Sequence, residues 1–371
     1  MDLYLSTRVK RGGALERQRG HRATGKRTEG PWMILRRALI AMVTTAVVAG
    51  IPAMASAKQP VARELTAFAA PGCAGGCGSG STVGPDKALY VTDGPGGRVL
   101  RVDPGTGAVT TFASGLPRAV PEAGIGGAMD VVFLGDTAYV LVTLVGPAFG
   151  QPDVVNGIYR IDKNGSATAI ADVGAWSIAH PPATDFFVAS GVQYALEKFR
   201  GSLVVSDGHH NRVLRVSRDG DIRPMLAFGN IVPTGLEIHG KTIYMAEAGP
   251  IPHLPQNGKV VRFTPRSPAV EVASGASLIV DVEFGRGRQL YALSQGIWDL
   301  PATPENEGKP ASPDTGTLLR VTKDGGLASV VDGLDRPTSL EFIGSTAFVV
   351  TLTGKVIRID DVSQNGDGKT R

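Results

Sequence analysis

One short motif recurs six times along this chain and constrains the fold more than any other feature of the sequence. Each copy is strand-like, with an arginine between apolar residues, as in GRVLRVD (97–103) and GKVIRID (354–360). The six arginines are Arg101, Arg160, Arg215, Arg262, Arg320 and Arg358. A short apolar segment precedes each copy, as LYV (89–91) precedes the first. Repeats with about four strands each are typical of β-propellers, so six copies predict an all-β, six-bladed β-propeller.

The composition and the apolar pattern support this fold. The chain contains 49 glycines and 25 prolines among 371 residues, which favours many turns between short strands. Hydrophobic residues make up 42% of the chain, too many for general disorder. The expected strands are apolar almost without interruption rather than at alternate positions. Blades stacked around an axis bury both faces of each sheet, and this accounts for that pattern.

The two ends of the repeat region predict how the ring closes. The last copy ends at Ile359 and Asp360 with no strand-like segment after it, whereas a spare strand, 63–70, precedes the first copy. We therefore expect 63–70 to pair with the last blade as its outer strand. The propeller then covers residues 58–361, and the tail 362–371 is expected to be disordered.

Residues 33–57 have the layout of a secretory signal peptide. Arg36 and Arg37 form a positive segment, an apolar run follows, and two A-x-A sites end at Ala57. The run is shorter than the roughly 20 residues of a membrane span. We expect a secreted or periplasmic protein with no membrane span after cleavage. Residues 1–32 are then a basic, disordered extension, with Met33 as an alternative start.

Charge argues against a nucleic-acid partner. The net charge is +4, but residues 1–57 hold ten Lys or Arg and three acidic residues, so the remaining chain carries −3. A domain without excess positive charge lacks the electrostatic basis for binding phosphates. We expect a small molecule or a protein as the ligand, and a monomeric chain.

Cys73 and Cys77, in the segment CAGGC, are the two cysteines of the chain. In an oxidising compartment two cysteines this close can pair, so a structural disulfide is predicted. Free thiols are the alternative. The spacing is not that of a C-x-x-C redox pair, and a metal site would need two more ligands.

The motifs resemble those of a known group of proteins. VSDGHHNRVLRV (205–216) resembles the D-x-G-x-N-R run of NHL-type propeller repeats. The order of segments over 61–361 is similar to that of the ScyD/ScyE family of exported bacterial six-bladed propellers, which are related in fold to the TolB-like superfamily. The resemblance implies the fold and export. It also implies a link to scytonemin-type pigment gene clusters, without an agreed reaction. The stretch CAGGCGSGSTVGPDKALYV departs from the family pattern at the first inner strand.

The expected channel lies where the inner strands begin. The candidate side chains there are Asp130, Thr234, Asp281, Thr338 and Ser339. Asp130 and Asp281 occupy equivalent positions, and two carboxylates near one axis suit a divalent cation such as Ca²⁺, together with carbonyls and water. The alternative is that they cap strand ends by accepting hydrogen bonds from loop amides.

Glu237, Glu283 and Glu341 form a second set, shortly after the start of three inner strands. An unpaired buried carboxylate is costly, so we expect each to pair with one of the repeated arginines of a neighbouring blade or to lie at an exposed edge. A catalytic acid and base pair is the alternative interpretation.

Three further acids, Asp93, Asp207 and Glu247, directly follow the second strand of their blades. Asp followed by Gly is typical of a hairpin turn. In the related gluconolactonase-type lactonases an acid and amide set holds a channel metal, and the resemblance makes Asn156, Asn211 and Asn257 the amide candidates. Those asparagines also read as turn residues.

Long insertions rich in proline and glycine lie at 144–156, 174–190 and 296–315. Trp176 and Trp298 lie within these insertions. Outside them, His209 is followed directly by a second histidine, and two consecutive histidines do not easily bind one metal ion. If the insertions share one face, that face is the predicted functional surface. The alternative is that each tryptophan packs against its own loop.

Two functions follow from these patterns. The first is an exported binding or scaffold protein, because the sequence has no complete catalytic set. The second is a metal-dependent, lactonase-like hydrolase that uses the central channel. Four oxygen ligands converging near the axis would favour the hydrolase. The sequence itself leaves open whether the chain is an enzyme, and it requires no cofactor.

Overall fold

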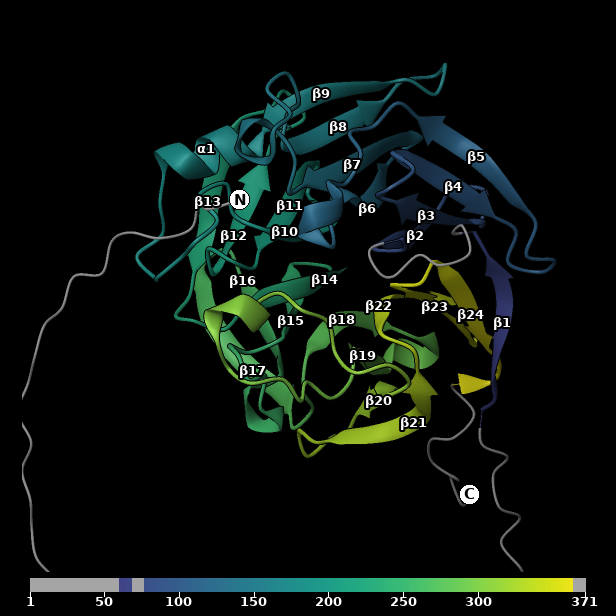
Figure 1. The fold of residues 1–371 in the computed structure, drawn as a ribbon. Coiled ribbons are helices and arrows are strands. Elements are labelled where there is room, and N and C mark those ends of the chain that lie inside the picture. Colours follow the sequence, from purple (N-terminus) through teal and green to yellow (C-terminus); the bar gives the residue numbers. More distant parts are fainter. Residues whose placement is uncertain (1–59, 69–76, 363–371) are drawn as a thin grey trace, which may run out of the picture. The chain divides into compact units, whose positions relative to one another are not determined.

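Six separate four-stranded antiparallel sheets form the part of the chain that the structure describes. The structure is a computed structural model that describes residues 60–68 and 77–362. The sheets are arranged around a central axis as the blades of a propeller (Figure 1). We call the axial region next to the six inner strands the channel. The all-β, six-bladed fold predicted from the repeat is confirmed. The extension 1–32, the signal peptide 33–57 and all but Val362 of the predicted tail lie outside the described residues.

The strands of each blade follow the chain order from the channel outwards. Blade 1 contains β2 (Ser81–Val83), β3 (Leu89–Asp93), β4 (Arg98–Val102) and β5 (Val109–Ser114). Blade 2 contains β6 (Gly127–Leu134), β7 (Thr137–Thr143), β8 (Gly157–Ile161) and β9 (Ala167–Asp172). Blade 3 contains β10 (Gln193–Phe199), β11 (Ser202–Asp207), β12 (Arg212–Val216) and β13 (Ile222–Ala227).

The second half of the ring repeats this order. Blade 4 contains β14 (Pro233–His239), β15 (Thr242–Glu247), β16 (Lys259–Thr264) and β17 (Ser267–Ser274). Blade 5 contains β18 (Ile279–Phe284), β19 (Leu290–Ser294), β20 (Gly316–Val321) and β21 (Leu327–Leu334). Blade 6 contains β22 (Pro337–Ile343), β23 (Thr346–Thr351), β24 (Lys355–Ile359) and, as its outer strand, β1 (Ala62–Ala67).

The pairing of β1 with β24 closes the ring. Ala62 lies opposite Ile359, and Ala67 lies opposite Lys355. The first described strand thus completes the last blade, as the sequence predicts for the segment 63–70. Exposed ion pairs between Lys355 and Glu64 and between Arg63 and Asp360 accompany this pairing. Such exposed pairs contribute little, so backbone pairing and packing hold the closure.

Helical segments are short and lie in the connections. α1 (Val173–Ala179) follows blade 2, and the Asp172 carboxylate caps it by accepting a hydrogen bond from the Ala175 amide at 2.7 Å. The 3-10 turns are η1 (Pro121–Ala123), η2 (Pro147–Phe149), η3 (Pro255–Asn257), η4 (Arg286–Arg288) and η5 (Pro304–Asn306). Within the described ranges, no helix has both the length and the apolar character that crossing a membrane requires.

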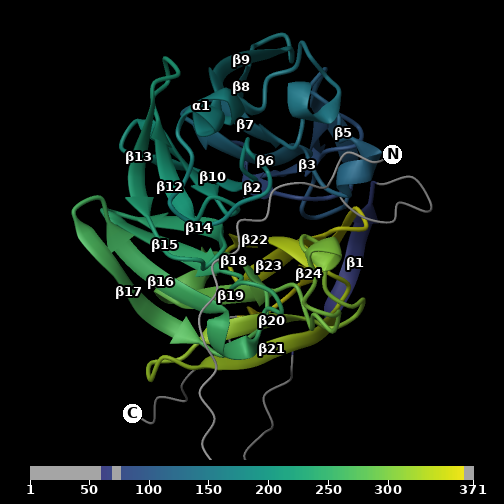
Figure 2. The ribbon, with the colours of Figure 1, turned by 60° about the vertical axis from the view of Figure 1, so that its left-hand side comes forward.

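The apolar core lies between neighbouring blades. Val91 of β3 is buried against Val350 of blade 6, and Tyr90 of the same strand is buried against Val131 of blade 2. Successive residues of one strand therefore pack against different neighbouring blades. This explains the near-continuous apolar strands. Outer strands such as β13 and β17 lie at the rim of the ring (Figure 2), and the outer strand β5 is largely exposed.

The repeated arginines have local partners. Arg101 lies 2.6 Å from the Asp86 carboxylate, Arg160 lies 2.9 Å from Asp162, and Arg358 lies 2.8 Å from Asp360. Each of these pairs lies within one blade. In these three blades the repeated arginine pairs with an aspartate and not with a channel glutamate, which differs from the expectation for Glu237, Glu283 and Glu341. The arginine heads lie near the surface on the third strand, while the glutamates lie on the inner strands.

Candidate functional site

One end of the propeller carries all three insertions. Strands alternate in direction within an antiparallel blade. The loop between the second and third strands therefore lies on the same side of the ring as the connection to the next blade. Insertions 144–156 and 296–315 join second and third strands, and insertion 174–190 joins blade 2 to blade 3. We call this end the loop face. The sequence expectation that the insertions share one face therefore agrees with the strand topology.

Four consecutive inner strands place a glutamate at the same register position. Glu197, Glu237, Glu283 and Glu341 lie opposite Val204, Tyr244, Tyr291 and Phe348, which occupy equivalent positions on the second strands. All four glutamates are half-buried. Thr82 and Val132 take this position in blades 1 and 2. The channel is therefore acidic on the side of blades 3 to 6.

Glu197 is the member of this set that the sequence analysis missed. It follows Leu196 in the segment YALEKF, as Glu237 follows Leu236 in TGLEI and Glu341 follows Leu340 in TSLEF. The shared Leu-Glu pair was a usable signal. The start of the inner strand in blade 3 differs from those of the other blades, which concealed it.

Asp130 and Asp281 lie two residues nearer the loop face than the glutamate position, in blades 2 and 5. These blades are opposite each other in the ring. A Cβ on Gly80 of the chain before blade 1 would clash with the Asp130 carboxylate, and one on Gly235 of blade 4 would clash with the Asp281 carboxylate. Glycine at these two positions leaves room for the aspartate side chains.

Each aspartate joins its own blade to the next. Asp130 Oδ1 accepts a hydrogen bond from the Val131 amide at 2.8 Å, and its Oδ2 accepts one from the Leu196 amide of blade 3 at 2.7 Å. Asp281 accepts equivalent bonds from the Val282 amide at 2.8 Å and the Leu340 amide of blade 6 at 2.7 Å. This geometry supports a structural capping role, with amides of a neighbouring inner strand in place of loop amides.

The hydroxyl candidates also bridge blades. Thr234 Oγ1 donates a hydrogen bond that reaches the Ile279 carbonyl of blade 5 at 2.8 Å. Thr338 Oγ1 donates to the Gly78 carbonyl, just before blade 1, at 3.3 Å. Ser339 Oγ lies 2.9 Å from Ser81 Oγ of blade 1. These contacts hold adjacent blades in register and leave the hydroxyls engaged with protein groups.

The channel carboxylates disfavour one another's charge. Burial raises the pKa of Glu197 to about 8, with a further increase from Glu237. Burial likewise raises the pKa of Glu237 to about 7 and that of Asp281 to about 7. The pKa values of Asp130, Glu283 and Glu341 also lie well above their usual range, because of burial and then, for the two glutamates, neighbouring glutamates.

One cation opposes this trend. The exposed Lys198, next to Glu197, lowers the pKa values of both Glu197 and Glu237. Backbone hydrogen bonds also lower the pKa values of Asp130, Asp281 and Glu237, but burial outweighs them. The channel therefore carries less negative charge at neutral pH than its number of carboxylates implies. A positively charged group entering the channel would favour the ionised forms.

The carboxylates do not form a compact metal site. In the described part of the chain, no three His, Cys, Asp or Glu side chains are placed to hold one metal ion. Asp130 and Asp281, the sequence candidates for Ca²⁺, accept backbone hydrogen bonds on opposite sides of the ring. As they stand, these two carboxylates bind backbone amides and do not converge on one point.

The three acids at the ends of second strands are buried residues rather than loop residues. The Arg98 guanidinium lies 2.6 Å from Asp93, and the Arg212 guanidinium lies 3.1 Å from Asp207, in both cases directly across the strand pair. Glu247 lies opposite Lys259, and burial raises its pKa to about 7. Asp93 and Asp207 each precede a hairpin turn, as predicted, and Asp93 accepts a hydrogen bond from the Gly96 amide of that turn. Their pairing with an arginine across the strand ladder is a further role that the sequence did not reveal.

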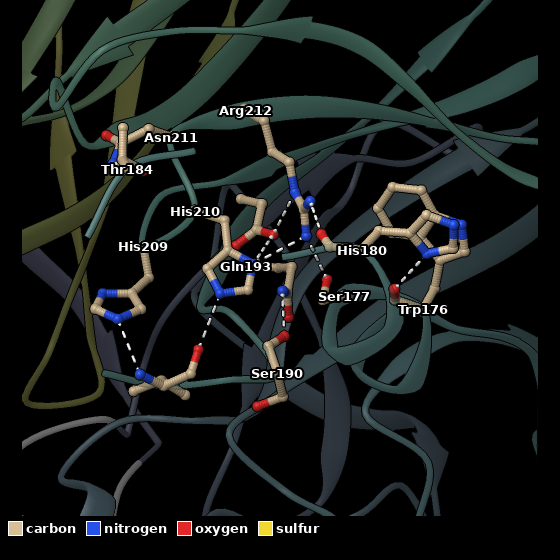
Figure 3. Close-up of polar contacts among 12 residues, drawn as sticks. Trp176, Ser177, His180, Thr184, Ser190, Gln193, His209, His210, Asn211 and Arg212 are labelled. Atoms are coloured by element: carbon tan, nitrogen blue, oxygen red, sulfur yellow. Dashed lines mark hydrogen bonds and ion pairs between the residues drawn. The ribbon is translucent and has the colours of Figure 1, made fainter. Parts of the chain in front are cut away.

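The turn between β11 and β12 holds the insertion before blade 3 (Figure 3). His209 Nε2 accepts hydrogen bonds from the Phe187 amide at 2.8 Å and the Val188 amide at 3.0 Å. His210 Nε2 lies 3.0 Å from the Val188 carbonyl, to which it must donate. The adjacent histidines thus bind backbone groups of the insertion.

Arg212 extends this network and is nearly buried. Its guanidinium donates to the His180 carbonyl at 2.6 Å and to Ser177 Oγ at 2.9 Å (Figure 3). It also lies over the Trp176 ring, at 4.9 Å from the ring centroid. Trp176 stacks on His180 with the centroids 4.3 Å apart. Trp176 is therefore half-buried and held from both sides.

The asparagines that the resemblance proposed as metal ligands are separated from one another. Asn211 Oδ1 accepts hydrogen bonds from the Ile231 and Val232 amides. Asn156 is buried beside Gly174, and neither its amide oxygen nor its amide nitrogen has a hydrogen-bond partner. Asn257 packs against Gly249. None of these contacts is with a channel carboxylate.

Trp298 packs within its own insertion. Its side chain is 6% exposed, its indole nitrogen donates to the Lys309 carbonyl at 3.1 Å, and its ring meets His253 edge to face. This is the alternative that the sequence left open.

Cys77 is also buried, and it is disulfide-bonded. Cys73, the other cysteine of the chain, lies outside the described residues.

Exposed apolar side chains lie on the loop face instead. Ile178, Phe186 and Phe187 lie on the insertion before blade 3, while Leu254 and Ile297 lie on the loops of blades 4 and 5. Beside Ile297 a hollow of about 500 Å³ is lined in part by Asp314 and Asp332. Sequence patterns do not reveal these side chains, because isolated apolar residues in loops resemble core residues.

The insertion of blade 5 extends towards blade 3. Burial raises the pKa of Tyr194 on β10 to about 12, and the carboxylates of Asp207 and Glu307 add to this increase. Glu307 belongs to the insertion 296–315, two blades away along the ring. An acid on this insertion is thus within electrostatic reach of the inner strand of blade 3.

Comparisons with known proteins show the fold. No protein-family model and no curated protein matches the chain. Among solved structures, a virginiamycin B lyase from Staphylococcus aureus has a TM-score of 0.50 at 15% identity, covering 81% of this chain and 99% of the lyase. The gluconolactonase XC5397 from Xanthomonas campestris has a TM-score of 0.54 at 14% identity, covering 81% and 89%.

A third similar structure is the calcium-binding protein regucalcin from Agrobacterium tumefaciens. Its TM-score is 0.54 at 12% identity, and the match covers 81% of this chain and 93% of regucalcin. At these identities the likeness shows the six-bladed propeller fold alone. The resemblance to the ScyD/ScyE family stays a prediction.

Proposed function

We propose that this chain is an exported binding protein whose central channel takes a positively charged ligand. The observation that carries the proposal is the placement of Glu197, Glu237, Glu283 and Glu341 at one register position of four consecutive inner strands. Acids gathered in this way oppose folding, because each disfavours the charge of the others. A cation bound among them would remove that penalty.

The arrangement favours an organic cation over a bare metal ion. The described residues offer no cluster of three acidic, histidine or cysteine ligands around one point. A ligand with separated amino groups matches carboxylates that are spread over four blades. The exposed side chains of Phe186, Phe187 and Ile297 on the loop face suit a ligand that also has an apolar part.

A metal-dependent hydrolase is the second candidate. It is supported by the propeller fold shared with a gluconolactonase and with a protein described as calcium-binding. Acids in the channel are the residue type that a divalent cation would need. Such a site would require the carboxylates of the channel to move together, because they do not converge as they stand.

Export and the pigment connection belong to the same proposal. The segment 33–57 supports export to the periplasm or the medium, and the ScyD/ScyE resemblance supports a ligand from scytonemin-type pigment pathways. Expression of the full precursor, followed by N-terminal sequencing of the exported form, tests the first point. A mature N-terminus near residue 58 is expected, and retention of an intact precursor in the cytoplasm would contradict it.

Calorimetric titration of the purified chain with spermidine and, separately, with CaCl₂ tests the ligand class. We expect saturable spermidine binding that weakens at least about tenfold in the double variant E283Q/E341Q, since charge-assisted hydrogen bonds contribute about 1.5–3 kcal/mol each. The control D136N/D219N removes two exposed charges elsewhere and should bind normally. Tight calcium binding with no spermidine binding would favour the hydrolase candidate, and metal analysis of the purified protein would support it.

A further inference from the structure

Four consecutive residues of one turn hold the connection between blades 2 and 3. His209, His210 and Arg212 contact its backbone, and Asn211 Nδ2 donates to Thr184 Oγ1 at 3.3 Å. We call residues 180–190 the connector. We propose that the connector is a pH-sensitive lid: protonation of His209 releases it from the β11–β12 turn and exposes the Asp207–Arg212 pair to solvent.

The hydrogen bonds of His209 require an unprotonated ring nitrogen. Its Nε2 accepts two amide hydrogens, from Phe187 at 2.8 Å and from Val188 at 3.0 Å. A ring nitrogen accepts hydrogen bonds only while its lone pair is free. A proton on Nε2 would remove both bonds and place a third hydrogen against the two amide hydrogens. Protonation therefore turns two attachments of the connector into repulsive contacts.

The surroundings of His209 keep it neutral when the connector is closed. Burial lowers the pKa of His209 to about 4, and the neighbouring His210 lowers it further, while Asp207 opposes the shift. The Arg212 guanidinium, at the start of β12, lies 2.9 Å from His210 Nδ1. Asp185, on the connector itself, is exposed. Release would return His209 towards its ordinary pKa of about 6.5, so acid favours the open state.

The connector covers a buried charged cluster. Phe186 packs edge to face on His210, and Phe187 packs in the same way on His209. Beneath them, the side chains of Asp207 and His210 are 0% exposed. Asp207 Oδ1 has no hydrogen-bond partner, and neither has Ser190 Oγ at the end of the connector.

These unpartnered atoms favour opening. A buried polar atom without a partner costs free energy that water would recover. Phe186 and Phe187 are 41% and 53% exposed, so their release loses only part of a full apolar burial. The closed connector therefore depends on the hydrogen bonds of the turn, and His209 supplies two of them.

Hydrogen–deuterium exchange of the full chain at pH 7.5 and pH 4.5 tests this inference. After correction for intrinsic rates, we expect the protection of peptides covering 180–190 to fall at least about tenfold at the lower pH. Peptides from the buried strand β19 should keep their protection. Loss of protection over the whole chain, or an unchanged connector, would overturn the proposal.

The variant H209Q separates the histidine from other acid effects. The glutamine side-chain oxygen can accept the same amide hydrogens but does not titrate in this range. We expect the connector of H209Q to stay protected at pH 4.5. The control H239Q changes an exposed histidine on β14 and should respond to pH as the unmodified protein does. An acid response of H209Q equal to that of the unmodified protein would refute the role of His209.

A direct titration decides the question even if H209Q folds poorly. The NMR titration of the His209 ring in the unmodified protein should give a pKa well below 6.5. A value at or above 6.5 would overturn the inference. The test is independent of the channel proposal, since none of these measurements involves a ligand.

Discussion

Asp130 of blade 2 binds the backbone amide of Leu196 of blade 3, with 2.7 Å between Oδ2 and the amide nitrogen. The other carboxylate oxygen binds the adjacent Val131 amide. Asp281 repeats the arrangement with Leu340, three blades further round the ring. The two aspartates at this level of the channel therefore connect neighbouring blades by hydrogen bonds. In this role they differ from the glutamates deeper in the channel.

The hydrogen bond between Asp281 and blade 6 predicts a loss of stability when it is removed. D281A leaves the Leu340 amide without its acceptor and should lower the free energy of unfolding by about 1–3 kcal/mol. Urea denaturation measures the change, and D136A, at an exposed turn, serves as the control. Unchanged stability together with a lost response to spermidine would instead identify Asp281 as a ligand-binding residue.

The glycine facing Asp281 predicts a second effect. A Cβ on Gly235 would clash with Asp281 Oδ1, so G235A must displace the Asp281 side chain. We expect it to cost about 1–3 kcal/mol, as overpacked positions do. G229A is a matched control, because a Cβ there meets no atom within 4 Å. Equal thermal stability of the two variants would contradict the close approach.

The raised pKa values of the channel glutamates predict a pH dependence with a definite sign. A carboxyl whose pKa is about 7 or 8 in the fold, and about 4.3 when unfolded, binds more protons in the folded state between these values. Its contribution to stability is present at low pH and is lost as the pH rises.

The double variant E283Q/E341Q should remove part of this loss. Its free energy of unfolding should exceed that of the unmodified protein by on the order of 1 kcal/mol or more at pH 8, and by less at pH 5. Denaturation curves at both pH values measure the difference. A gain that is larger at pH 5 than at pH 8 would show that the glutamates are ionised and paired in the fold.

The ion pairs of blades 1 and 3 occupy equivalent positions and predict different costs. R212A leaves the buried Asp207 carboxylate without its charged partner, so we expect a loss of about 3–5 kcal/mol. The Arg98 side chain is 38% exposed, and Asp93 keeps a hydrogen bond from the Gly96 amide, so R98A should cost about 1 kcal/mol or less. Comparable unfolding midpoints for the two variants would argue against the difference in burial.

Residue patterns predicted the ring and its closure for a definite reason. Backbone pairing and burial on both faces repeat in every blade, so Arg101 and its five equivalents recur with the strand that bears them. The spare strand before the first repeat then has one unpaired edge to meet, that of β24. Glu237, Glu283 and Glu341 were recognised in the same way, from their shared position after an apolar residue.

The partners of the polar side chains could not be predicted in this way. The arginines were expected to meet the glutamates, yet Arg101 meets Asp86 at the surface. Asp207 precedes the β11–β12 turn as expected, but its partner was not predicted: the register of these strands places Arg212 directly across from it and buries both. A sequence motif does not state which residue of a neighbouring strand or loop a side chain will reach.

The repeat, the number of blades and the order in which strands pair could be predicted from the residues alone, because these features depend on local periodicity and backbone hydrogen bonding. The fold in three dimensions was needed to show that glutamates from four blades come within electrostatic reach of one another and that His209 binds the amides of Phe187 and Val188. Such contacts join segments that share no period, and their strength depends on burial, which exists only once the ring has closed.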